Sequence, residues 1–158
     1  MNKDLEKNIK KLVKINLDAH EGYKTAADNV NDNLLNTFLS QCAKDRKSYA
    51  LSLAREINIE PDEISTHFKA DLHRVWMDLR TSPQKFNAKT VLKECERGEK
   101  HAVEAYDDVV KENKYPASLE KQIRLQRDEI NNKFDRIREM EKEYDLKDDM
   151  RNQQTSVP

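Results

Sequence analysis

Apolar residues recur along the chain every three to four positions, the spacing that places them on one face of an α-helix. In the first such stretch, from residue 4 to about 31, these positions are Leu5, Ile9, Leu12, Ala19, Tyr23, Ala26 and Val30. In the second, from 34 to about 58, they are Leu35, Phe38, Leu39, Cys42, Tyr49, Leu53 and Ile57. The polar segment between them supplies caps and a turn through Asn29, Asn31, Asp32 and Asn33. The pattern therefore predicts two long, antiparallel helices.

A second pair of long helices is predicted after an interruption. Pro61 breaks the pattern, a shorter helix follows over about 64–80, and the segment around Pro83 ends it. Helical spacing then covers 88–113, and a last helix begins with Pro116 in its first turn and continues to about 145. The inward positions of these two helices are Leu92, Cys95, Val103, Tyr106 and Val110, then Leu119, Ile123, Ile130, Phe134, Ile137 and Tyr144.

The connection between the second and third long helices fixes the expected architecture. At about 25 residues it can cross the length of a bundle, so the third helix can point the same way as the second. One long crossover of this kind is the ferritin-like arrangement. We therefore expect an all-α, ferritin-like four-helix bundle over residues 1–145, with a short helix in the crossover. A polar, frayed C-terminal tail is expected over 146–158, where apolar periodicity is missing.

The composition narrows the classes of protein to which the chain can belong. Charged residues make up 37% of it, yet the formal net charge is −1. Disordered chains usually combine few apolar residues with a large net charge and lack periodicity, so a folded protein is the better interpretation. A near-neutral chain lacks the excess of basic residues with which proteins coat nucleic acid. Neither a signal peptide nor a membrane-spanning run is visible, so we expect a cytoplasmic protein without nucleic-acid or membrane partners.

In ferritin-like di-metal proteins, two helices each carry an inward Glu that binds metal, and the other two each carry Glu-x-x-His. The sequence contains no Glu-x-x-His. Instead, the second helix places Arg46 at the centre of its stripe, and the third places Glu99 there with Glu96 beside it. Counting turns puts Tyr23 at the same height. We predict a buried polar layer of Tyr23, Arg46, Glu96 and Glu99, with Arg46 paired to Glu99 in place of a metal ion.

A reduced metal site is the alternative for the same layer. Glu96 and Glu99 can contribute two ligands from one helix face, and His20 can supply a third. Such a site would hold iron or manganese, although a nearby arginine makes these three residues a poor cage.

The two cysteines, Cys42 and Cys95, both face inward at similar heights. They form neither a disulfide framework nor a Cys-x-x-Cys pair. One interpretation is that both are buried and act as small apolar residues, and the other is a regulatory disulfide between them.

Several segments resemble a family of uncharacterised bacterial proteins, namely EGYKTAADNV (21–30), LHRVWMDLR (72–80), LKECERGEKHAVEAY (92–106) and FDRIREM (134–140). The resemblance covers most of residues 5–145, and its most specific parts are the Trp-containing segment and ECERGE. Members are described as ferritin-like four-helix-bundle proteins of unknown function, so the resemblance implies the bundle and its crossover helix but no activity. The last helix of the family often has a His where this sequence has Phe134, which argues against an inherited metal site.

The favoured interpretation is a non-catalytic helical-bundle protein without a cofactor, associated with stress responses by analogy. Ferritin-like relatives store iron or perform oxygen chemistry, but a shared fold alone does not transfer either function. The alternative is a carboxylate-bound iron or manganese protein with redox or metal-storage activity. A further alternative is an adaptor that uses its helix faces to bind a protein partner or a second copy of itself.

Overall fold

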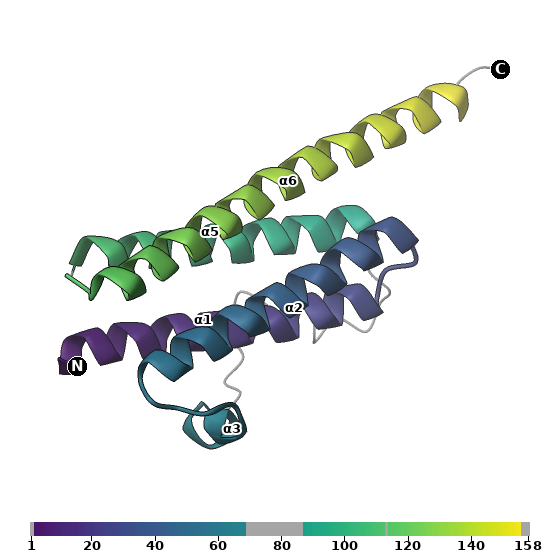
Figure 1. Cartoon of the computed structure of the whole chain (residues 1–158). Coiled ribbons are helices and arrows are strands. Elements are labelled where there is room, and N and C mark those ends of the chain that lie inside the picture. Colours follow the sequence, from purple (N-terminus) through teal and green to yellow (C-terminus); the bar gives the residue numbers. More distant parts are fainter. Residues whose placement is uncertain (1, 69–86, 113, 156–158) are drawn as a thin grey trace.

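The computed structural model describes residues 2–68, 87–112 and 114–155, and within them all regular structure is helical. Four long helices dominate: α1 (Lys3–Asp28), α2 (Asn33–Glu56), α5 (Ala88–Glu112) and α6 (Ala117–Thr155) (Figure 1). A 3-10 turn, η1 (Pro61–Glu63), and a short helix, α3 (Ile64–His67), follow α2. The all-α prediction is therefore confirmed. The predicted helix over 64–80 begins as expected at Ile64, but most of it lies outside the described residues.

The helices begin where the sequence provides caps. The Asn2 side chain accepts a hydrogen bond from the backbone N–H of Asp4 at 2.9 Å. The Asp32 side chain accepts one from the N–H of Leu35 at 3.0 Å. These side chains satisfy amide groups that have no partner within the first turn of a helix, so the polar residues just before the apolar stripes set the starts of these two helices.

The long helices form two antiparallel pairs, in which α1 lies along α2 and α5 along α6. Figure 1 shows that α2 and α5 run in the same direction, so the chain crosses from one end of the molecule to the other between them. Side-chain contacts agree with this arrangement. Asn8 Nδ2, near the start of α1, donates to the Tyr115 hydroxyl just before α6 at 3.2 Å, and the Tyr144 hydroxyl, far along α6, donates to Asp32 before α2.

The described residues form two apolar core clusters, each of which contains residues from all four long helices. The first apolar cluster contains Ile9, Leu12, Val13, Ile15, Ala50, Leu53, Ala54, Ile59, Ala102, Ala105, Tyr106, Val109, Tyr115, Leu119, Ile123 and Ile130. The second contains Ala19, Tyr23, Ala26, Ala27, Val30, Leu35, Leu39, Cys42, Ala43, Val91, Leu92, Cys95, Ile137 and Met140. Between the two clusters, α1, α2 and α5 carry the buried polar residues Asn16, Arg46 and Glu99. The candidate site therefore lies at the boundary between the two halves of the core.

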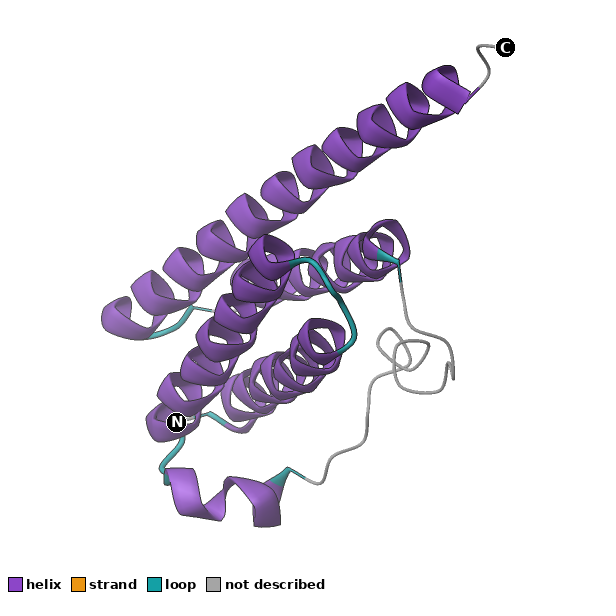
Figure 2. Cartoon of the chain, turned by 90° about the vertical axis from the view of Figure 1, so that its right-hand side faces the viewer, coloured by secondary structure: helices purple, strands orange, loops and turns teal. Residues whose placement is uncertain are grey.

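The last helix is longer than the sequence pattern predicts. An end near residue 145 is expected, but α6 continues to Thr155. All side chains from Asp145 to Gln154 are exposed, and Figures 1 and 2 show this end projecting beyond the other helices. Adding residues to an existing helix requires no new nucleus, so helix-forming polar residues can extend it without core contacts. Apolar periodicity thus marks where packing ends and not where the helix ends.

None of the described helices combines the length and the apolar character needed to cross a membrane.

Candidate functional site

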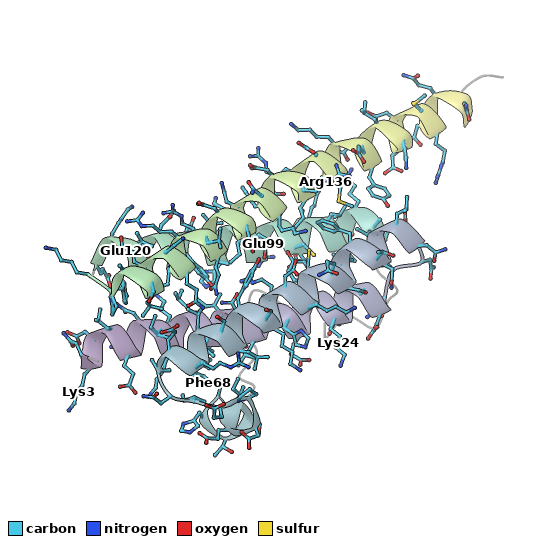
Figure 3. The ribbon with its side chains drawn as sticks, viewed as in Figure 1. Lys3, Lys24, Phe68, Glu99, Glu120 and Arg136 are labelled. Carbon is cyan, nitrogen blue, oxygen red and sulfur yellow. The ribbon has the colours of Figure 1, made fainter. Side chains whose placement is uncertain are left out.

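A network of buried polar side chains joins the four long helices at the boundary of the two apolar clusters. We call it the polar layer, and it consists of Asn16, Tyr23, Arg46, Glu99, Tyr106 and Gln126. Each of these residues is at most 5% exposed. Figure 3 shows Glu99 in the middle of the molecule, between the two helix pairs. Buried polar groups are costly unless they are hydrogen-bonded, so the connections within the layer matter for folding.

The centre of the polar layer is an ion pair between α2 and α5. Arg46 Nη1 donates a hydrogen bond to Glu99 Oε1, and the two side chains are 3% and 1% exposed. Arg46 Nε also donates to Asn16 Oδ1 on α1 at 2.6 Å. The guanidinium therefore links three helices through two of its nitrogens. Such pairs are charge-assisted and short, and removing either partner is destabilising because the other charge is then buried without compensation.

Neutral groups extend the network from Asn16 to the last helix. Asn16 Nδ2 donates to the Tyr106 hydroxyl at 2.6 Å and to the Leu12 carbonyl oxygen at 2.8 Å. The Tyr106 hydroxyl in turn donates to Gln126 Oε1 at 2.8 Å. One continuous chain of hydrogen bonds thus runs from Glu99 through Arg46, Asn16 and Tyr106 to Gln126.

Burial dominates the electrostatics of the polar layer. It raises the pKa of Glu99, while the Arg46 guanidinium and a hydrogen bond from Tyr23 act in the opposite direction. Burial also opposes the charge of Arg46, but Glu99 and the neighbouring tyrosines raise the pKa of that guanidinium above its usual value. The Tyr106 hydroxyl has its pKa raised to about 12, mainly by burial. Arg46 is therefore a permanent internal cation, and Tyr106 is a neutral hydrogen-bond donor at physiological pH.

The structure brings Tyr23, Arg46 and Glu99 together but not Glu96. The Glu96 side chain is 32% exposed and its Oε1 lies 3.7 Å from Arg138 Nε on α6. Because Glu96 precedes Glu99 by three residues, it is rotated by about 60° around the helix and lies one turn away. That rotation turns it from the interior toward the surface beside α6. Glu96 is therefore corrected from a member of the buried layer to a partner of α6.

His20 is also not directed at Glu99. Its ring Nδ1 lies 2.7 Å from the Ala43 carbonyl oxygen, its Nε2 lies 4.0 Å from Glu21 Oε1, and its side chain is 18% exposed. Within the described ranges, no group of three or more His, Cys, Asp or Glu side chains is placed to hold a metal ion. Glu99 instead binds Arg46, which cannot act as a ligand. The residues of this layer do not fit a di-iron or di-manganese centre.

Cys42 on α2 and Cys95 on α5 are both buried in the second apolar cluster, and each is a free thiol. Burial raises the pKa of Cys42 to about 12 and that of Cys95 well above its usual value. A thiol attacks or coordinates as the thiolate, so these two groups are held in their unreactive form. This environment favours the interpretation of both cysteines as small apolar core residues.

Two carboxyl groups, whose meeting the residue spacing does not predict, lie together between α5 and α6. Burial, together with a hydrogen bond to Glu96 and the charge of Glu96, raises the pKa of Glu141 to about 7. Lys93 acts in the opposite direction and Asp145 adds to the rise. Helical periodicity places Glu96 beside the stripe of its own helix, but it does not reveal that Glu96 meets Glu141. Only the way in which α6 is placed against α5 brings the two carboxyl groups together.

The Glu96–Glu141 pair predicts a pH dependence of stability. The pKa of Glu141 lies above its usual value of 4.5, so the folded protein binds more protons than the unfolded chain between pH 4.5 and about 7. The stability that protonated Glu141 contributes to the folded protein is complete below this pH window and is lost as the pH rises through it. Because Glu141 is only partly buried, solvent screening limits the loss to about 1 kcal/mol. Urea unfolding of the wild type and of Glu141→Gln across this pH window measures the loss in the free energy of unfolding. Parallel pH profiles for the two proteins would contradict the prediction.

Comparison with known proteins identifies one family. A family model described as a domain of unknown function (DUF2383) matches residues 4–112, which run from α1 to the end of α5. No curated protein matches the chain. The matched region contains Asn16, Tyr23, Arg46, Glu99 and Tyr106, so most of the polar layer, including its ion pair, lies within the family domain.

Proposed function

The chain belongs to the DUF2383 family, a domain of unknown function, and we propose that it is a non-catalytic, ferritin-like four-helix bundle with an internal ion pair in place of a di-metal centre. The observation that carries the proposal is the Arg46 guanidinium, which is buried and bonded to Glu99. A cytoplasmic role in stress responses, taken over by analogy with ferritin-like proteins, is part of the proposal.

The arrangement of the helices supports a ferritin-like origin. Two antiparallel pairs are joined by a long connection, and α2 and α5 run in the same direction (Figure 1). In ferritin-like proteins, inward carboxylates from the facing helices meet in one layer of the bundle interior. Here Arg46 on α2 and Glu99 on α5 meet in such a layer, between the two apolar clusters.

The chemistry of the polar layer supports a non-catalytic role. Its one carboxylate, Glu99, is 1% exposed and is already engaged by a permanent cation. Tyr23 and Tyr106, the hydroxyl groups of the layer, have raised pKa values because they are buried, so neither is activated as a nucleophile or base. A charge pair that is enclosed in this way holds the helices in register, which is an attested use of buried polar groups.

Metal titration separates this proposal from the iron or manganese alternative. Protein incubated anaerobically with Fe²⁺ or with Mn²⁺ and then desalted is expected to retain well below one equivalent, measured by elemental analysis. Glu99→Gln is the control, because it removes the only carboxylate of the polar layer and leaves the surface carboxylates in place. Stoichiometric metal in the wild type that is lost in Glu99→Gln would overturn the proposal in favour of a redox or storage protein.

The end of α6 favours a second candidate function, an adaptor that binds a second copy of this chain. Leu146 and Met150 are 63% and 64% exposed. Because they lie four residues apart, both are on one face of α6. Two such faces can cover each other in a symmetric dimer. Light scattering is then expected to show a dimer for the wild type and a monomer for Leu146→Glu/Met150→Glu. A wild-type protein that stays monomeric at high concentration would exclude self-association through this face.

A further inference from the structure

One nitrogen of the buried guanidinium has no protein partner in the described part of the chain. Arg46 Nε donates to Asn16 and Nη1 donates to Glu99, but Nη2 has no hydrogen-bond partner among the described residues. The side chain is only 3% exposed. A buried, charged N–H group without an acceptor is strongly unfavourable, and native proteins usually satisfy such a group with protein atoms or with ordered water.

A small cavity adjoins this guanidinium and is lined by residues of all four long helices. It measures about 10 Å³, taken as the space open to the centre of a water-sized sphere. One water molecule needs roughly 10–15 Å³ by the same measure. Besides Arg46, the lining includes Tyr23, Asp45, Tyr49, Glu99 and Lys133. The cavity is therefore of the right size for a single water, and its walls offer both donors and acceptors.

We propose that this cavity is a binding site for one ordered water molecule, which accepts a hydrogen bond from Arg46 Nη2. The charges of the lining argue for a neutral occupant, because Arg46 and Lys133 are balanced by Asp45 and Glu99. A bare anion would lie against the two carboxylates and a bare cation against the two basic groups. Water, in contrast, accepts from the guanidinium and donates its own two hydrogens to carboxylate oxygens.

The water would also connect the buried carboxyl to the surface. Glu99 is 1% exposed, whereas Asp45 and Lys133, which also line the cavity, are partly exposed. A water between these groups gives Glu99 a short hydrogen-bonded route for proton exchange between α2 and α6. The polar layer is thus completed by a solvent molecule and is not closed by protein atoms alone.

A high-resolution crystal structure of the wild-type protein tests the site directly. The expected result is one density peak at roughly 2.7–3.2 Å from Arg46 Nη2, with at least one further contact to a carboxylate or hydroxyl oxygen. Density for no solvent in the cavity, or a protein acceptor bonded to Nη2, would overturn the proposal. Density for an ion would do so as well, because the assigned occupant is neutral.

Magnetic relaxation dispersion, which counts long-lived internal waters, provides a test in solution. Ile130 lines the cavity, so Ile130→Phe is expected to fill it and to lower the count by one. Ile123→Phe is the matched control, because Ile123 is buried on the same helix but does not line the cavity. Equal counts for Ile130→Phe and the wild type would contradict the proposal. If Ile130→Phe does not fold, the crystal structure of the wild-type protein alone decides whether the cavity holds a water.

Discussion

Replacing Arg46 with leucine is expected to lower the free energy of unfolding by roughly 3–5 kcal/mol, because Glu99 is then left buried without its counter-charge. The substitution also removes the donor to Asn16 Oδ1. For a chain of this size, each kcal/mol corresponds to about 2–4 °C in Tm, so a loss of roughly 6–20 °C is expected. Urea unfolding followed by circular dichroism, with thermal melting as a second measurement, gives both quantities.

Two further variants separate the loss of the ion pair from a general effect of removing an arginine. In Arg46→Leu/Glu99→Leu both charges are absent, so much of the lost stability is expected to return. Arg124→Leu is the matched control, since Arg124 pairs with Glu120 at 2.9 Å on the exposed surface of α6, where such pairs contribute about 0–1 kcal/mol. If Arg46→Leu were as stable as the wild type, the guanidinium would not be held in the interior in solution.

The position of Arg46 could be predicted because apolar periodicity defines a face, and Arg46 lies at the centre of that face on α2. The same reasoning placed Glu99 on the inward face of α5, and the structure shows both residues buried. The long helices were predicted to within a few residues, apart from the end of α6, since Asp32 and the other polar residues between the stripes cap them. Local spacing and capping thus determine the helices and their inward faces.

The remaining features depend on how one helix is rotated against its neighbour. Glu96 lies near the stripe of α5, so its spacing predicts an inward position, but in the structure it contacts Arg138 and Glu141 of α6. A rotation of about 60° around the helix separates an interior residue from one at the edge of the buried face. An apolar stripe is roughly 100° wide or more, so the stripe alone does not distinguish the two positions. Contacts between helices that are far apart in sequence were therefore beyond prediction from spacing.

The hydrogen-bonded partners within the layer were missed for the same reason. Asn16 and Gln126 are polar residues that the structure shows to be buried. The sequence does not indicate that the Tyr106 hydroxyl lies between them, with Asn16 Nδ2 at 2.6 Å and Gln126 Oε1 at 2.8 Å. The sequence suggested Tyr106 only as an apolar residue, and its hydroxyl is what extends the ion pair to α6.

Tyr106→Phe is therefore expected to destabilise the protein by roughly 2–4 kcal/mol, although it removes a single oxygen atom. Without the hydroxyl, Asn16 loses one acceptor and Gln126 loses its donor, and both amides remain in the interior. Each buried polar group left unsatisfied costs about 1–3 kcal/mol. Tyr49→Phe is the matched control, because the Tyr49 hydroxyl donates to Glu129 at the exposed edge of α6, where water can replace it. Urea unfolding of both variants measures the difference.

A double-mutant cycle between Tyr106→Phe and Arg46→Leu tests whether the polar layer acts as one unit. The two side chains do not bond directly but share Asn16, which accepts from Arg46 and donates to Tyr106. After either substitution Asn16 can reorient, so the second substitution costs less than it does alone. The losses are expected to fall short of additivity by more than 0.5 kcal/mol, the usual limit for independent sites. Additive losses would mean that Arg46–Glu99 and Tyr106–Gln126 are separate interactions that happen to be neighbours.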